Sequence, residues 1–124
     1  AEYAARAREY GITIITRDEV EIRGIEDVLE DAFEIAAGSA GIYVDLDVDV
    51  CDRSVVPACP AAAPGGLSSY ELRLAARLAG ADSRVRAIDL AEIDAANDSV
   101  DGRTVRLAAL CLLEAAAGRL SSRL

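Results

Sequence analysis

The sequence predicts an α/β fold in which a parallel sheet is flanked by helices. Three runs rich in β-branched and other apolar residues, at 12–16, 41–50 and 85–93, are typical of strands. Segments with helical spacing of apolar residues lie between and after these runs. Strands that alternate with helices pair in parallel through right-handed crossovers. The chain has 124 residues, 52% of them hydrophobic, which suffices for one domain with a packed core.

The N-terminal elements follow from local patterns. Residues 1–10 predict the end of a helix, and the run ITIIT at 12–16 predicts a short buried strand. The charged residues 17–23 are expected to form a loop. Apolar residues then recur every three or four positions across 25–36, which predicts an amphipathic helix that stops near Gly38.

Clear breaks separate the later elements. The later part of the chain is predicted to form a strand at 41–50, a loop at 51–66, a helix at 68–79, a strand at 85–93 and a final helix at 104–117. Three prolines in 51–66 exclude regular structure there. Ser68 or Ser69 is a suitable N-cap for the first of these helices. Gly80 and Gly118 are expected to end the two helices.

Composition excludes several classes of function. The net charge of −9 argues against binding to a nucleic-acid backbone. All 13 basic residues are Arg, so histidine acid–base catalysis, Ser-His-Asp triads and lysine Schiff bases are excluded. The three cysteines have no metal-binding spacing and are expected to be free and buried, as in a cytoplasmic protein. No apolar run is long enough to span a membrane.

A ladder of aspartates, Asp45, Asp47 and Asp49, marks the strand at 41–50. Side chains alternate along a strand, so these three carboxylates are expected on one face, roughly 6.6 Å apart. Three like charges on a covered face are unfavourable unless a divalent cation offsets them. Ligands of parallel sheets bind at the carboxyl ends of the strands, where Asp47 and Asp49 lie. The alternative interpretation is an edge strand with a solvated acidic face.

The motif DxDxxD formed by Asp47, Asp49 and Asp52 is followed by further motifs in a fixed order. These are Pro57, then Pro64-Gly65-Gly66-Leu67-Ser68, then Asp89-Leu90-Ala91-Glu92-Ile93. Together they resemble the ureohydrolase family of arginases, agmatinases and formimidoylglutamases over nearly the whole chain. Asp45 stands where the family often has Ser, and Arg53 replaces the usual Pro. The loop at 58–63 looks more like that of formimidoylglutamases.

The resemblance implies a partial arginase-type three-layer αβα fold, with residues 1–124 as the C-terminal portion of a ureohydrolase domain. It implies a site for two Mn²⁺ ions with Asp47 and Asp49 as ligands, and Glu92 as the partner of a cationic amidine or guanidine substrate. Asp52 is expected to order the loop and Asp89 to be structural. The activity implied is hydrolysis of a linear amidine or guanidine C–N bond, and the family commonly forms homo-oligomers.

The family's remaining metal ligands include histidines from upstream motifs, and this chain has no His. The chain by itself is therefore expected to be incomplete and inactive, and no catalytic residue is assigned to it. We expect natural sequence upstream of Ala1, because the chain starts without Met in a helix-like segment. That upstream segment or a companion chain would complete the site.

Three other interpretations are weighed against this one. Asp45 and Asp47 also fit the nucleophile and acid/base of a haloacid-dehalogenase-type phosphohydrolase, although its lysine is absent. A phosphoacceptor receiver domain fits the length but lacks the acidic pair and the lysine. A non-catalytic metal-binding or assembly subunit is the third.

Overall fold

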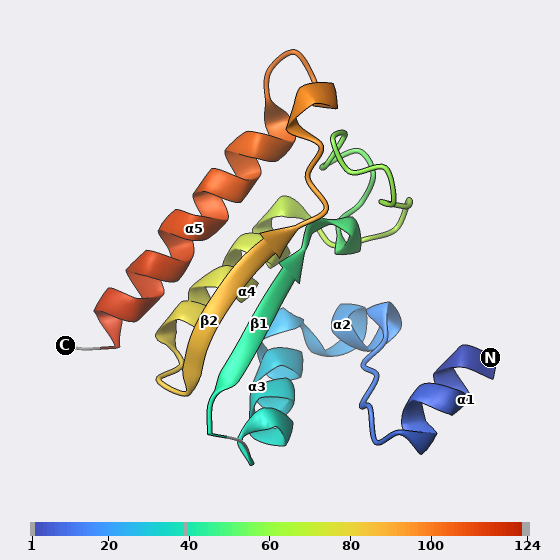
Figure 1. Ribbon diagram of the computed structural model, residues 1–124, viewed down its shortest axis with the longest axis vertical. Coiled ribbons are helices and arrows are strands. Elements are labelled where there is room, and N and C mark those ends of the chain that lie inside the picture. Colours follow the sequence, from blue (N-terminus) through green and yellow to red (C-terminus); the bar gives the residue numbers. More distant parts are fainter. Residues whose placement is uncertain (1, 39, 123–124) are drawn as a thin grey trace.

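Two parallel strands form the centre of the protein. In the computed structural model, which describes residues 2–38 and 40–122, β1 (Ile42–Asp47) pairs with β2 (Val85–Ala91) (Figure 1). The register places Asp45 opposite Asp89 and Asp47 opposite Ala91. The predicted α/β fold with a parallel sheet is therefore confirmed, and both strands are shorter than the sequence suggested.

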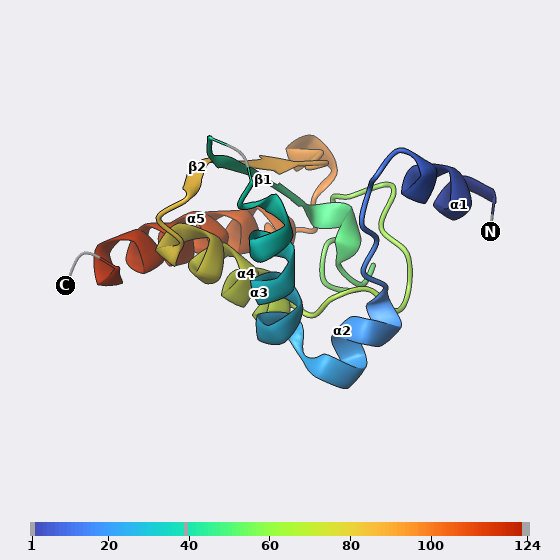
Figure 2. The ribbon, with the colours of Figure 1, turned by 90° about the horizontal axis from the view of Figure 1, so that it is seen from below.

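Three helices lie against one face of this sheet. They are α3 (Ile25–Ala36), α4 (Ser69–Ala81) and α5 (Arg103–Ser121), all on the same side of the strands in Figure 2. The other face carries Tyr43, which is 64% exposed, and the exposed Asp45 and Asp89. The expectation that both faces of β1 are covered is not met by the residues that the structure describes.

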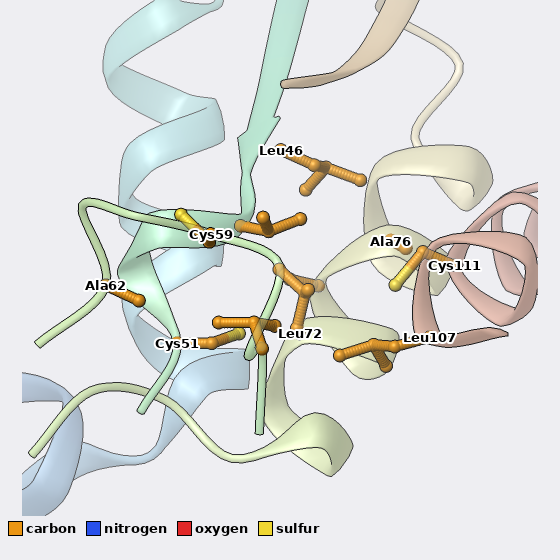
Figure 3. Close-up of a cluster of buried hydrophobic side chains, with 11 residues drawn as sticks. Leu46, Cys51, Cys59, Ala62, Leu72, Ala76, Leu107 and Cys111 are labelled. Atoms are coloured by element: carbon orange, nitrogen blue, oxygen red, sulfur yellow. The ribbon is translucent and has the colours of Figure 1, made fainter. Parts of the chain in front are cut away.

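The core lies between the covered sheet face and α4 and α5 (Figure 3). Its buried members are Leu46, Val48, Cys51, Val56, Cys59, Ala62, Leu72, Ala75, Ala76, Leu107 and Cys111. All three cysteines are free and buried, as predicted. With few aromatic side chains, small and branched residues fill this space, which brings the helices close to the sheet and to each other.

Two glycines were predicted to end helices but lie inside them. A side chain at Gly80 of α4 would overlap the backbone of Ala115, and one at Gly118 of α5 would overlap the carbonyl of Arg77. The glycines therefore allow the two helix backbones to approach closely. Glu114 adds ion pairs to Arg73 (2.6 Å) and Arg77 (2.8 Å) across the same contact.

The N-terminal region differs most from the sequence prediction. Helix α1 (Glu2–Glu9) is present and has no buried residue. Residues 12–16 do not form a strand, because no strand of the described chain lies beside them to accept their hydrogen bonds. The predicted loop 17–23 is helix α2 (Arg17–Arg23), begun by a capping box between Thr16 and Glu19.

The later elements are closer to prediction. Ser68 caps α4 through a capping box with Glu71, and the helix extends to Ala81 rather than Ala79. The loop 51–66 contains no helix or strand. Short 3₁₀ turns, η1 (Val48–Val50) and η2 (Ala95–Asn97), follow the two strands. No helix among residues 2–38 and 40–122 combines the length and hydropathy that crossing a membrane requires.

Candidate metal and substrate site

The predicted site residues gather at the carboxyl end of the sheet. Asp47 is the last residue of β1 and stands opposite Ala91, the last residue of β2. Glu92 follows directly, and Asp49 lies two residues beyond Asp47 in η1. The parallel pairing thus brings Asp47, Asp49 and Glu92 to one edge, where parallel α/β sheets bind ligands.

The alternation predicted for the aspartate ladder holds only in part. Asp45 and Asp47 belong to β1, in which alternate side chains share a face, but the chain turns into η1 before Asp49. The backbone N–H of Asp49 donates to Oδ1 of Asp47 at 3.1 Å, so Asp47 caps this turn. The position of Asp49 is therefore set by a 3₁₀ turn and not by the pleat of the strand.

Negative charge is crowded along this edge. Burial raises the pKa of Asp49, and the charge of Asp47 raises it further. Burial also raises the pKa of Asp45, followed by the charge of Asp89 on the neighbouring strand. Tyr43 relieves part of the crowding by donating its hydroxyl proton to Asp89 at 2.6 Å. A bound cation would favour the ionised carboxylates in the same way.

The carboxylates at this edge are suitable ligands for manganese, but they are too few to form a complete site. Carboxylate oxygens are suitable ligands for Mn²⁺. Among the residues that the structure describes, no group of three or more His, Cys, Asp or Glu side chains could hold a metal ion. Asp47 and Asp49 can therefore supply part of a ligand set, which residues from outside this chain would have to complete.

Glu92 has an unusual backbone conformation. Its φ of 64° lies in the left-handed region, and within the described residues it is the one non-glycine residue there. Two residues later, the backbone N–H of Asp94 donates to the carbonyl of Ala58 at 3.0 Å. This bond holds the segment that follows β2 against the loop at 51–66. The exposed Glu92 side chain is thus carried on a strained backbone, a feature that clusters at binding and active sites.

Asp52 has the predicted role of ordering the loop. Its Oδ1 accepts hydrogen bonds from the Ser54 hydroxyl (2.6 Å) and N–H (2.8 Å), and its Oδ2 accepts one from Gly65 N–H (2.7 Å). These bonds, led by that from the Ser54 hydroxyl, lower the pKa of Asp52 to about 2. The carboxylate thus connects the two ends of the loop.

The loop is fixed in place by its backbone as well. The backbone N–H of Leu67 donates to the carbonyl of Val50 (2.8 Å), and the carbonyl of Leu67 accepts from the backbone N–H of Asp52 (2.9 Å). Arg53, which stands where the family usually has Pro, adds a further contact. It is exposed, and its guanidinium donates to the carbonyl of Cys59. Cys59 itself is fully buried in the core.

A cavity of about 450 Å³ lies beside Asp49. Arg17, Val20, Pro64, Gly65 and Leu67 are among its other lining residues, and Glu92 is not. Arg17 was not among the predicted site residues, because residues 17–23 were expected to form a loop. The T-x-x-E capping box at Thr16 and Glu19 was the signal that could have placed Arg17 at a helix start beside the site.

A parallel α/β domain with carboxylates at the ends of adjacent strands has the arrangement in which such sheets commonly bind ligands. The chain belongs to the arginase family, whose family model matches residues 1–118. This assignment overturns the dehalogenase-type and receiver-domain alternatives. It also agrees with the order of motifs from Asp47 to Glu92.

Individual relatives agree with the family. Formimidoylglutamase from Bacillus subtilis is 32% identical over 117 residues, which cover 94% of this chain and 36% of that protein. The crystal structure of the B. subtilis enzyme superposes with a TM-score of 0.90 at 31% identity, over 99% of this chain and 38% of that one. Trypanosoma cruzi formiminoglutamase with Mn²⁺ gives 0.84 at 28% identity, covering 96% of this chain and 39% of that one. The chain thus spans less than 40% of the length of these relatives.

Proposed function

We propose that this chain supplies the carboxylate portion of a manganese-dependent amidinohydrolase site that cleaves a C–N bond of formimidoylglutamate or a similar linear amidine. The observation that carries the proposal is the convergence of Asp47, Asp49 and Glu92 at the carboxyl end of adjacent strands in an arginase-family chain. Support for the metal comes from the Mn²⁺ in the T. cruzi relative. Support for the substrate comes from the formimidoylglutamases among the relatives.

Each side chain has a defined task in this proposal. Asp47 and Asp49 would hold Mn²⁺ through hard carboxylate oxygens. Bound Mn²⁺ supplies Lewis-acid activation of water for attack on the amidine carbon. Glu92 would bind the planar amidinium, because a carboxylate accepts two parallel N–H bonds from such a cation. Asp52 keeps the loop beside Asp49 ordered through its bonds to Ser54 and Gly65.

The chain alone is proposed to be inactive. It contains no His, and its described residues provide no group of three metal donors. We expect the purified chain with added Mn²⁺ to show weak metal binding by electron paramagnetic resonance and no release of product from formimidoylglutamate. Turnover by the isolated chain would contradict this part of the proposal. The same donor count favours a second candidate, a non-catalytic metal-binding or assembly subunit.

A chimera separates the two candidates. Residues 1–118 of this chain would replace the matching region of B. subtilis formimidoylglutamase, which supplies the rest of the fold. We expect manganese-dependent hydrolysis of formimidoylglutamate in preference to agmatine. A folded chimera that binds Mn²⁺ without turnover would favour the non-catalytic candidate.

Substitutions in the chimera test the assigned roles. Asp47→Asn and Asp49→Asn should lower both the bound manganese and the activity. Glu92→Gln should retain manganese and lower kcat/KM roughly 100-fold, because the substrate loses its positioning partner. Asp18→Asn, which changes an exposed acid on α2, is the matched control and should leave both measurements unchanged. Equal effects of Glu92→Gln and Asp18→Asn would exclude the proposed role of Glu92.

A further inference from the structure

Arg53 occupies the turn that follows the aspartate motif. The backbone N–H of Val55 donates to the carbonyl of Asp52 at 2.8 Å, so residues 52–55 form a β-turn with Arg53 at its second position. Proline is favoured at this position because its ring fixes φ, which agrees with the proline that the family usually has there. Arginine lacks that restriction, so other contacts must keep the turn in place in this chain.

Two hydrogen bonds from Arg53 cross the loop. Its backbone N–H donates to the carbonyl of Ala63 at 3.1 Å, and its guanidinium donates to the carbonyl of Cys59. Proline has neither an N–H nor a guanidinium, so it could make neither bond. Ala63 lines the cavity beside Asp49. Arg53 therefore connects the start of the loop to two points further along it.

The carbonyl of Cys59 depends mainly on this guanidinium. Cys59 is fully buried in the cluster of Figure 3, so its carbonyl needs a donor from the protein. The backbone N–H of Ala62 also donates to it, but at 3.4 Å. A guanidinium makes a charge-assisted bond, which is stronger than a bond between neutral groups. Loss of the Arg53 guanidinium should therefore loosen the loop around Cys59.

The same part of the loop holds the segment that carries Glu92. Ala58, the residue before Cys59, is 2% exposed, and its carbonyl accepts from the backbone N–H of Asp94 at 3.0 Å. Asp94 lies two residues beyond Glu92, whose left-handed φ of 64° is a conformation that persists only when the surroundings hold it. Because Ala58 and Cys59 are consecutive, a displacement of Cys59 also shifts the carbonyl that holds Asp94.

We propose that Arg53 is a positioning residue for Glu92. Its guanidinium fixes the carbonyl of Cys59, and the adjacent carbonyl of Ala58 fixes the backbone of Asp94. This connection keeps the Glu92 carboxylate in the place where it meets an amidinium. The inference rests on the proposed function, in which Glu92 binds the substrate, and it assigns to Arg53 no contact with substrate or metal.

Amide hydrogen exchange of this chain, measured by nuclear magnetic resonance, tests the connection without any activity. Arg53→Ala removes the guanidinium and should make exchange of the Asp94 N–H about 10-fold faster. Exchange in α4 should stay unchanged, which separates a local effect from a loss of global stability. Arg53→Lys keeps a cationic donor and should restore part of the protection. Arg106→Ala, which changes an exposed arginine on α5, is the matched control. Unchanged exchange at Asp94 in Arg53→Ala, or an equal change in Arg106→Ala, would overturn the proposal.

The chimera with B. subtilis formimidoylglutamase tests the role in the reaction. Arg53→Ala should keep the bound manganese and lower kcat/KM about 10-fold, because Glu92 is displaced. In the Glu92→Gln background the same substitution should change kcat/KM by less than about 2-fold, since the group that Arg53 positions is already lost. Additive effects would overturn the proposal, because a residue that only stabilises the fold acts equally in both backgrounds. An inactive unsubstituted chimera would contradict the proposed function, and the exchange measurement would still decide whether Arg53 holds the segment after Glu92.

Discussion

Two regions of the molecule, the loop at 51–67 and the N-terminal segment at 2–16, differ in burial in the opposite way to what their local sequence patterns suggest. The loop is rich in Pro, Gly and Ala, yet Cys51, Val56 and Cys59 within it are fully buried. The N-terminal segment has a helix and a β-branched run, yet Tyr3 is 88% exposed and Ile12 56% exposed. Burial and satisfied polar groups therefore decide which region is held in place, and local propensity does not.

The largest effect is expected where the loop backbone is closest to another segment. A side chain at Gly66 would overlap the backbone of Cys51 and Asp52. Gly66→Ala should therefore lower the free energy of unfolding by about 3 kcal/mol, since neither backbone segment can move aside easily. Urea denaturation measures the change. Gly38→Ala is the control, because no atom lies within 4 Å of a side chain there. Similar values for the two variants would show that the loop is less constrained than its contacts indicate.

A buried hydroxyl links the loop to α5. Thr104 is fully buried, and its Oγ1 accepts a hydrogen bond from Ala58 N–H at 3.0 Å. Thr104→Val keeps the volume but leaves that N–H unsatisfied, which should cost about 2 kcal/mol by thermal or urea unfolding. Thr104→Ser retains the acceptor and should lose less. If Ser and Val were equally destabilising, packing and not the hydrogen bond would explain the role of Thr104.

Acid should weaken the loop before it affects the N-terminal segment. The pKa of Asp52 is about 2 in the folded protein, below its ordinary 3.8, so the unfolded chain binds protons more readily. Its stabilising contribution is therefore complete above about pH 4 and is lost as the pH falls through 2. The urea midpoint should fall over this range, and Asp52→Asn should flatten that dependence. An unchanged pH profile in Asp52→Asn would contradict this role.

The smallest effect is expected in the N-terminal segment. Ile14 is 36% exposed and belongs to no helix or strand. Ile14→Thr should change the free energy of unfolding by no more than about 0.5 kcal/mol. Limited proteolysis should cleave first within residues 2–16 and should spare the loop. Early cleavage within 51–67 would contradict the expectation that the loop is held in place more firmly than the N-terminal segment.

Elements that depend on local chemistry could be predicted from the sequence. The amphipathic helix at 25–36 and the Ser68 cap of α4 follow from spacing and capping residues, and both are confirmed. Gly80 and Gly118 were misassigned as helix ends because a glycine that permits close packing has the same local pattern as one that ends a helix. A strand at 12–16 would need a neighbouring strand to pair with. The local sequence pattern does not show whether such a neighbour is present.

The candidate site was predictable to the level of the sheet edge. Parallel pairing of two recognisable strands was enough to bring Asp47 and Glu92 together. The orientation of Asp49 was not predictable, because the change from strand to 3₁₀ turn depends on a hydrogen bond that Asp47 accepts. Arg17 was missed because its place beside the cavity depends on the start of α2.

The left-handed backbone at Glu92 has a consequence for the amino acids tolerated at that position. A φ of 64° suits Gly, Asn or Asp better than Glu and excludes Val, Ile and Thr. Selection for stability alone would therefore favour glycine or asparagine at position 92, whereas selection for a carboxylate on a longer side chain would retain glutamate. A saturation library at position 92, made in the chimera with B. subtilis formimidoylglutamase and scored separately for protein abundance and for turnover, would show opposite rankings of these residues.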